Sequence, residues 1–221
     1  MLNALRKAQI SDPKVEWLPI PDSLLAENRA VSPIDLWTRM TLTPGENLPR
    51  QDLDVICRQI TVEQTLQLRH SVLWPEKPVS HVYLPEDDRG LHMGAFIPSC
   101  DQPIAVISFF VEPAPINDVF KQEDIQRQAR FRKFACEPAF QGRGIGSRLL
   151  QNSFERARSQ LNCTVAWCDA RTSTAQWYMK RGMTPFGERF SKGPVEYIRM
   201  YIDISASVPV YDADSLVHVD R

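Results

Sequence analysis

A glycine-rich stretch, PAFQGRGIGSRLLQ at residues 138–151, contains the residue types that point most directly to ligand binding. Single residues separate Gly142, Gly144 and Gly146, and a helical pattern begins within the stretch. The first turn of a helix carries about four backbone N–H groups without partners and about half a positive charge. Glycines let these donors converge on a ligand that approaches the backbone closely. The stretch therefore predicts a phosphate or pyrophosphate site.

Two phosphate-binding patterns fit this stretch poorly. A P-loop, G-x-x-x-x-G-K-[ST], needs a lysine for the outer phosphates, and the turn contains none. A dinucleotide-binding turn has G-x-G-x-x-G directly after a strand, whereas here residues 137–141 intervene and Ser147 replaces the third glycine. Asp169 does stand near the end of the next predicted strand, where such a fold has its acidic ribose ligand. An NAD(P)-binding oxidoreductase therefore stays as an alternative interpretation.

A third pattern, Q/R-x-x-G-x-G/A, holds a pyrophosphate on backbone N–H groups without lysine or metal, and Gln141-x-x-Gly144-x-Gly146 has this form. Together with WYMKRGM at residues 177–183, it resembles the GNAT acyl-CoA transferases, whose Y-x-x-x-G-F motif is matched here with Met183 for phenylalanine. The resemblance runs from about residue 55 to residue 204. The segments LRHSVLWP, WCDAR and GERF, followed by IRM, look like those of bacterial-type GNAT proteins of undefined acceptor.

The resemblance implies both a fold and a co-substrate. The fold is α/β, with a mixed, mostly antiparallel sheet that splays between its fourth and fifth strands and is flanked by helices. The co-substrate is acetyl-CoA, and no metal is required. The pyrophosphate would lie on Gln141, Gly142, Arg143, Gly144, Ile145, Gly146 and Ser147, and the pantetheine would pair with the backbone of Phe134, Ala135 and Cys136.

The resemblance also implies a catalytic role for Tyr178. In the family a tyrosine at this position lies near the CoA sulfur and can protonate the leaving thiolate, a task that suits a phenol with a free pKa of about 10. The sequence does not identify the general base. Glu112, Glu137 and Asp169 each end or follow a predicted strand, and His92 lies on one. We treat the three carboxylates as candidates for accepting the proton of the amine.

Acidic residues are the candidates for binding the amine acceptor. Glu86, Asp87 and Asp88 are consecutive and precede a predicted strand, where the family builds part of its acceptor wall. Three adjacent carboxylates would attract a cationic amine. Glu188 and Glu196, in the last predicted hairpin, are also candidates for binding the amine. Solvated loops without a binding role are the alternative for both groups.

Hydrophobic periodicity predicts the elements that position these residues. Helical segments have apolar residues three and four apart, and the strands alternate or form short apolar runs. The predicted order is a strand at 53–60, a helix at 61–74, strands at 91–97, 103–112 and 129–137, a helix at 144–161, a strand at 164–170, a helix at 173–182, and strands at 186–190 and 195–204.

Composition limits the classes of function. With 221 residues, 43% hydrophobic, the chain can bury a core, and its formal net charge of -1 argues against nucleic-acid binding by phosphate neutralisation. No apolar run approaches the roughly 20 residues of a membrane helix, and no secretory signal is recognised. The five cysteines fit no metal-binding spacing. Free thiols indicate a reducing compartment, so we expect a cytoplasmic or nuclear protein.

The sequence predicts one catalytic domain with two extensions. Residues 1–50 form a proline-rich, partly irregular arm with a short helix at 32–40, residues 51–204 the GNAT-like domain, and residues 205–221 a loosely held tail. The preferred function is N-acetyl transfer from acetyl-CoA to a primary amine, on a small molecule or peptide, by direct attack in a ternary complex. The alternative is a non-catalytic module that binds acyl-CoA or a partner. The oligomeric state stays open, a homodimer included.

Overall fold

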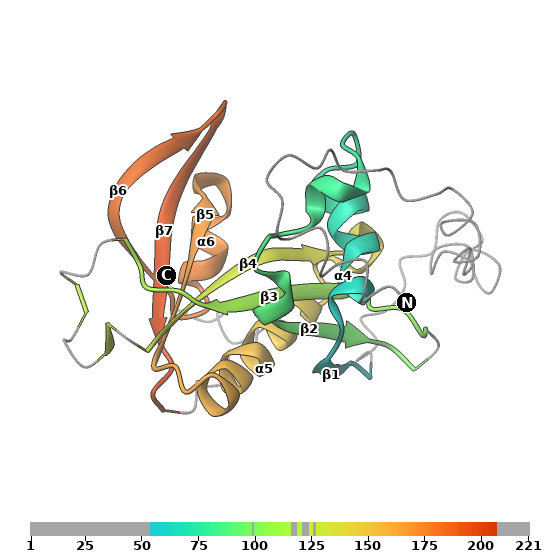
Figure 1. Ribbon diagram of the computed structural model, residues 1–221, viewed down its shortest axis with the longest axis horizontal. Coiled ribbons are helices and arrows are strands. Elements are labelled where there is room, and N and C mark those ends of the chain that lie inside the picture. The colour runs from blue at the N-terminus through green and yellow to red at the C-terminus, as the bar shows by residue number, and fades with distance from the viewer. Residues whose placement is uncertain (1–53, 99, 116–118, 121–123, 126, 207–221) are drawn as a thin grey trace, which may run out of the picture. The chain divides into compact units, whose positions relative to one another are not determined.

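The structure, a computed structural model, describes residues 54–98, 100–115, 119–120, 124–125 and 127–206 (Figure 1). The predicted arm, its helix at 32–40 and nearly all of the predicted tail lie outside these residues. The elements are β1 (Ile56–Gln59), α4 (Val62–Leu68), η1 (Arg69–Leu73), η2 (Val79–Val82), η3 (Asp87–Arg89), β2 (Leu91–Phe96), β3 (Ala105–Val111), β4 (Gln128–Cys136), η5 (Pro138–Phe140), α5 (Ile145–Gln160), β5 (Val165–Arg171), α6 (Thr172–Met179), β6 (Thr184–Lys192) and β7 (Val195–Asp203).

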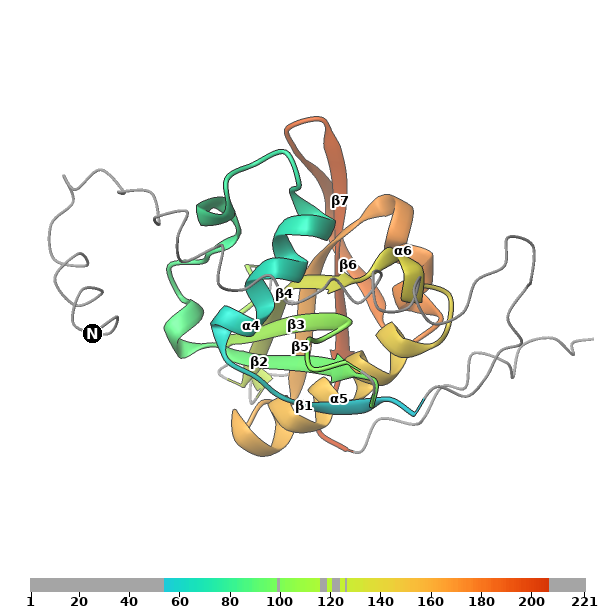
Figure 2. The ribbon, with the colours of Figure 1, turned by 90° about the vertical axis from the view of Figure 1, so that its right-hand side faces the viewer.

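The strands form one seven-stranded sheet in the order β1-β2-β3-β4-β5-β7-β6. The β4–β5 pair is parallel, and the other five pairs are antiparallel. Helices α4 and α5 lie on opposite faces of the β2–β4 half, as Figures 1 and 2 show. Helix α6 packs against β5, β6 and β7. The predicted order of elements and the mixed, mostly antiparallel sheet are confirmed.

Helix α5 forms because its apolar residues recur three and four positions apart, which places them on one face. Gly144, with φ 78°, caps its start, a backbone conformation that favours glycine. Leu161, the last residue of the helix predicted at 144–161, comes after the helix end and is only half-buried. The buried apolar residues of α5 are Ile145, Leu149, Leu150, Phe154 and Ala157, so the predicted stripe is otherwise confirmed.

The β4–β5 pairing covers only the first part of each strand. Register pairs join Gln128–Arg130 to Val165–Trp167, and none follows them. Strand β4 nevertheless continues to Cys136 while paired with β3 on its other side. The two strands therefore separate after Arg130 and Trp167, and the predicted splay is confirmed.

A bulge interrupts β4 within the splay. Two residues of β4, Lys133 and Phe134, lie opposite the single residue Ile107 of β3. Lys133 has φ 55°, in the left-handed region that a lysine rarely adopts. The extra residue reverses the alternation of side chains along the strand. Phe134 consequently contacts Trp177 of α6, whereas Ala135 packs with Val106 and Leu68 below α4.

A buried polar cluster holds the segment between α4 and β2. The predicted single helix at 61–74 continues from α4 into the π-helical turn η1, which begins at the fully buried Arg69. Arg69 donates two hydrogen bonds to the Asp87 carboxylate, at 2.7 and 3.0 Å, and one to Ser108 Oγ at 2.7 Å. His92 Nε2 donates to the Asp87 carbonyl, and Nδ1 accepts from Ser108 Oγ. These contacts fix η3 against the sheet.

Candidate active site

The glycine stretch forms an open turn between η5 and the start of α5. Gly142 and Gly144 have φ 73° and 78°, and a Cβ added at either would meet nothing within 4 Å. Gln141 Nε2 donates to the Cys136 carbonyl at 2.9 Å, which ties the turn to the end of β4. A ligand can therefore approach this backbone, where the first N–H groups of α5 point outward from the helix.

An arginine of the α6 end braces the first turn of α5. Arg181 Nε donates to Ser147 Oγ at 2.8 Å, and Nη1 donates to the Trp177 carbonyl at 2.6 Å. The guanidinium lies 3.5 Å from the centre of the Trp177 ring. A Cβ on Gly146 would lie 3.4 Å from Phe134 and 3.6 Å from Trp177. Trp177 is half-buried and supports the turn.

Tyr178 lies on the α5 and α6 side of the sheet. Its ring contacts Phe131 of β4 and Trp177, with ring centres 5.9 and 5.0 Å away. Burial, reinforced by the nearby Cys168 thiol, raises the pKa of Tyr178 well above 10. The phenol is therefore protonated at neutral pH and can donate a proton. Gly182, the last residue of the helix predicted at 173–182, lies two residues beyond the C-cap Lys180 and has φ 80°.

The end of β4 offers a thiol and a carboxyl group. Burial and the neighbouring Glu137 raise the pKa of Cys136 to about 11, so its thiol is protonated at neutral pH and a poor nucleophile. Burial also raises the pKa of Glu137. Phe134, Ala135 and Cys136 belong to the part of β4 that β5 does not pair. Their backbone is consequently open to another partner on that side.

A charged network crosses the splay on the face opposite Tyr178. Arg130 donates to Glu112 at 2.7 Å and to Asp169, and thereby links β4 to β5. Arg132 donates to Glu86 and, at 2.5 Å, to Glu112. Lys192 Nζ lies 2.6 Å from Asp169, and Arg199 Nε lies 3.8 Å from it. The network consists of Glu86, Glu112, Arg130, Arg132, Asp169, Lys192 and Arg199.

Two of the predicted base candidates belong to this network. Glu112 and Asp169 each contact two or more cationic side chains. Asp169 is only 9% exposed, and its Oδ1 has no hydrogen-bond partner among the described residues. Glu137 lies elsewhere, at the β4 end next to the glycine turn. His92 is buried in the Arg69 cluster, and burial lowers its pKa.

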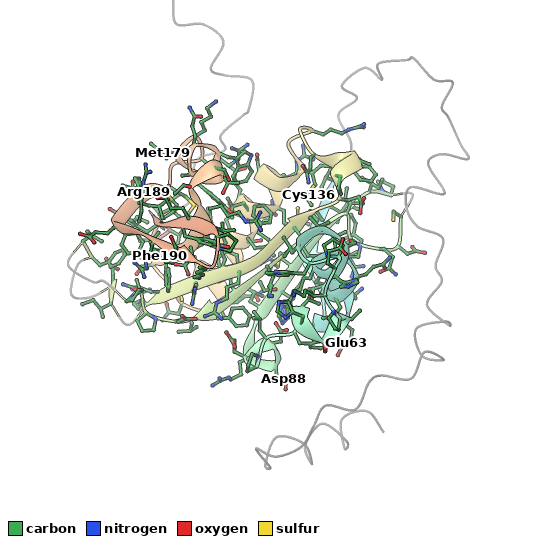
Figure 3. The ribbon with its side chains drawn as sticks, turned by 90° about the horizontal axis from the view of Figure 1, so that it is seen from above. Glu63, Asp88, Cys136, Met179, Arg189 and Phe190 are labelled. Carbon is green, nitrogen blue, oxygen red and sulfur yellow. The ribbon has the colours of Figure 1, made fainter. Side chains whose placement is uncertain are left out.

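The structure separates the five predicted acceptor-binding carboxylates. Glu86 belongs to the charged network, whereas Asp87 is 4% exposed and paired with Arg69, and Asp88 is exposed. Figure 3 shows Asp88 on the opposite side of β4 from Phe190 of β6. Glu188 and Glu196 are exposed, and Glu196 pairs with Arg189 at 3.4 Å. Three adjacent acidic residues in the sequence thus do not form one acidic surface.

The arginine and lysine side chains beside the splay were not predicted from the sequence. Arg130 and Arg132 alternate along a strand, a spacing that places both on one face and could have identified them. Arg199 and Lys192 gave no such signal, because their proximity depends on how β6 and β7 pair beside β5. Arg181 stands in the recognised WYMKRGM motif, but only the fold brings it to Ser147.

Within the described residues, no group of three or more His, Cys, Asp or Glu side chains could hold a metal ion. None of the helices in this part of the chain has the length and apolar character needed to cross a membrane.

Comparison with known proteins agrees with this geometry. A family model described as "Acetyltransferase (GNAT) domain" matches residues 81–184. An uncharacterized N-acetyltransferase of Bacillus subtilis, YitI, is 26% identical over 153 residues, which are 68% of this chain and 97% of the relative. The family model, the relative and the fold together support a member of the GNAT N-acetyltransferase superfamily. These matches indicate an acyltransferase, and the parallel β4–β5 pair with flanking helices agrees with the fold of this superfamily.

Solved structures share this GNAT fold. A putative N-acetyltransferase from Lactobacillus plantarum aligns with a TM-score of 0.53 and 16% identity, over 70% of this chain and 99% of that one. A spermidine N-acetyltransferase chimera, from Vibrio cholerae SpeG and hSSAT, aligns with a TM-score of 0.51 and 16% identity, over 68% and 96%. At these identities the likeness establishes the fold alone. The NAD(P)-binding alternative loses support, because the glycine turn follows the antiparallel strands β2–β4 rather than opening a βαβ unit.

Proposed function

We propose that this GNAT protein transfers an acetyl group from acetyl-CoA to a primary amine by direct attack within a ternary complex. The observation that carries the proposal is the β4–β5 pairing, which stops at Arg130 and Trp167 while β4 runs on to Cys136 and into the glycine turn. One continuous segment thereby offers an unpaired strand backbone followed by a helix start. These two features suit the amides and the pyrophosphate of one CoA molecule.

The residues present fit such a ligand. Gln141–Ser147 would hold the pyrophosphate on the backbone N–H groups of the turn, with Arg143 beside it, because nothing fills the space next to Gly142 and Gly144. The backbone of Phe134, Ala135 and Cys136 would pair with the pantetheine arm. When bound, acetyl-CoA supplies the activated acetyl group as a thioester.

Residues of the chain then position the reactants and protonate the leaving sulfur. The bulge at Lys133 turns the backbone of β4 inside the splay, where its N–H groups can polarise a carbonyl. Tyr178, kept protonated by its raised pKa, would donate a proton to the sulfur that leaves. Holding the two reactants in one geometry can lower the barrier by about 7–11 kcal/mol, so most of the rate enhancement would come from placement.

Glu112, Glu137 and Asp169 are the proposed alternatives for accepting the proton of the amine. Asp169 Oδ1 combines deep burial with a free acceptor position, and Asp169 borders the splay. Its other oxygen, Oδ2, is already held by Arg130 and Lys192. Burial raises the pKa of Glu137, which increases its basicity, but Glu137 lies next to the glycine turn. Substituting each by its amide and measuring kcat against pH distinguishes them.

The first experiment is thermal unfolding with acetyl-CoA, free CoA and NADPH, followed by measurement of thiol release with amine acceptors. A ligand at about 100 times its Kd adds about 2.7 kcal/mol of stability. We expect both CoA compounds to raise the melting temperature, NADPH to leave it unchanged, and thiol release to require an amine. CoA binding without transfer to any amine would instead favour the non-catalytic module. We also propose that residues 51–204 suffice for both activities.

A further inference from the structure

The charged network contains more positive than negative side chains. Its cations are Arg130, Arg132, Lys192 and Arg199, and its carboxylates are Glu86, Glu112 and Asp169. Lys133 lies beside it, in electrostatic contact with both Arg132 and Glu86. No ion pair of Lys133 with a carboxylate occurs among the described residues. This face of the splay is therefore an electropositive surface.

Aromatic rings support these cations without neutralising them. Arg130 lies 4.7 Å from the ring centre of Trp167, and Arg199 lies 4.4 Å from that of Phe190. Lys133 Nζ lies 3.8 Å from the ring centre of Trp74. A ring face attracts a cation through its quadrupole and brings no negative charge. The rings thus hold the guanidinium and ammonium groups in place and leave their charge available to a ligand.

Hydrogen-bonding capacity in the network is not used up. Within the described part of the chain, Arg199 makes no hydrogen bond, and its single ion-pair contact, to Asp169, is long at 3.8 Å. The Nε atoms of Arg130 and Arg132 also have no partner there. Asp169 Oδ1 is an unused acceptor next to these donors. Since buried polar groups are nearly always paired, a set of orphaned donors and one orphaned acceptor indicates a ligand that supplies both types.

The network occupies the position from which an acceptor would reach the acetyl group. Side chains alternate along a strand, so Arg130 and Arg132 face away from Phe131 and its neighbour Tyr178. The same alternation on β5 places Asp169 opposite Cys168, which interacts with Tyr178. The proposed proton donor and the charged network therefore lie on opposite faces of the splay. An amine that attacks from the face without helix α6 meets the network first.

We propose that the acceptor is an amine that also carries a carboxylate, such as a free amino acid, and that Arg199 binds this carboxylate while Asp169 orients the amine. This inference rests on the proposed acetyl transfer and names its substrate class. A guanidinium binds a carboxylate through two parallel N–H donors, and an ionised carboxylate accepts the hydrogen bonds of an amine. A polyamine has no group for Arg199 and is repelled by the surplus positive charge.

The test compares amines that differ only by the carboxylate. L-Ornithine is paired with putrescine and L-phenylalanine with phenethylamine, with spermidine as a further polyamine, and thiol release from acetyl-CoA is measured. We expect kcat/KM to be about 10- to 100-fold higher for each carboxylate-bearing member, the effect of one charge-assisted hydrogen bond. Equal or faster acetylation of putrescine, phenethylamine or spermidine would overturn the inference and leave the proposed transferase intact.

Variants then assign the preference to the network. Arg199→Gln should raise KM for the amino acids about tenfold and thereby reduce the preference in kcat/KM for them over their decarboxylated partners, and Arg199→Lys should restore part of the loss. Lys192→Gln, at a half-exposed position, provides a second variant with little risk to folding. Arg189→Gln is the matched control, because Arg189 is exposed on β6 next to Phe190 and outside the network (Figure 3). If both Arg199→Gln and Lys192→Gln keep the wild-type preference for carboxylate-bearing amines, the network does not bind the carboxylate. If CoA raises the melting temperature but no amine is acetylated, the proposed acetyl transfer fails, and this inference fails with it.

Discussion

Arg181 and Ser147, 34 positions apart in the chain, are joined by a 2.8 Å hydrogen bond from the guanidinium Nε to the hydroxyl oxygen. The bond connects the end of α6 to the first turn of α5, where the pyrophosphate would bind. We predict that Arg181→Gln weakens acetyl-CoA binding about tenfold, since a charged hydrogen bond that positions this turn is lost. Calorimetric titration measures the affinity. Lys180→Gln removes a neighbouring exposed charge and should bind normally; equal losses in the two variants would show a general charge effect.

Gly144 and Gly193 provide a matched pair of substitutions. Both have positive φ, 78° and 59°, and in both an added Cβ would enter open space. Alanine at either position should therefore cost about 1 kcal/mol of unfolding free energy through backbone strain. Only Gly144→Ala should also abolish the thermal shift caused by CoA, because its methyl group would occupy the approach to the turn. A normal shift in Gly144→Ala would mean that the pyrophosphate binds elsewhere.

Tyr178→Phe tests the proton donor without changing the ring contacts to Phe131 and Trp177. We expect kcat to fall about 100-fold, within the usual range for a general acid, while KM for acetyl-CoA stays constant. Steady-state kinetics from about pH 6 to about pH 10, the ordinary pKa of a tyrosine, provide the measurement. Tyr201→Phe, which keeps its packing against Phe120 and Phe186, is the control and should retain full activity.

The Arg69–Asp87 pair should be a major determinant of stability. Both side chains are buried, at 0% and 4% exposure, so Arg69→Met would leave an uncompensated carboxylate in the core. We expect a loss of about 3–5 kcal/mol in unfolding free energy. Asp87→Leu added to Arg69→Met should recover part of it, whereas Asp88→Asn, at the exposed neighbour, should change little. Urea unfolding measures all three, and a double variant no more stable than Arg69→Met alone would contradict this explanation.

Lys133 should make stability depend on alkaline pH. Burial, assisted by Arg69, lowers the pKa of Lys133 from 10.5 to about 8. Between these values the unfolded chain binds more protons than the folded one, so this group makes stability rise with pH from about 8 to 10.5. Lys133→Met should therefore be more stable than the wild type at pH 7, and the difference should shrink by pH 10. Urea unfolding at both pH values tests this, and the exposed Lys180→Met should show no such trend.

Local patterns were sufficient to predict much of this fold. The apolar positions of α5 and the order of strands follow from periodicity alone, and the glycine turn was identified from residues within one segment. The splay between β4 and β5 was implied by resemblance and is seen where their pairing stops. These features depend on neighbours in sequence or on a motif with a fixed geometry.

The electrostatics of the site depend on tertiary contacts and could not be predicted in the same way. Arg130 meets Asp169 from 39 positions away, so the sequence did not show that this carboxylate is already paired. Asp87 appeared to belong to an acidic loop, yet the π-helical turn that carries Arg69 draws it into the core. Likewise, only the pairing with β3 reveals the bulge at Lys133 and the reversal of side chains beyond it.

The short parallel pairing of β4 and β5 also affects how readily the chain aggregates in the cell. Beyond Arg130 and Trp167, β4 and β5 each have an unpaired edge inside the sheet, in addition to the outer edges of β1 and β6. An uncovered strand edge can pair with another protein chain. A pantetheine arm lying along β4 would cover one of them. Acetyl-CoA would thus protect the folded chain from aggregation as well as react on it. Chains synthesised during CoA starvation should therefore aggregate more readily than those made when CoA is abundant.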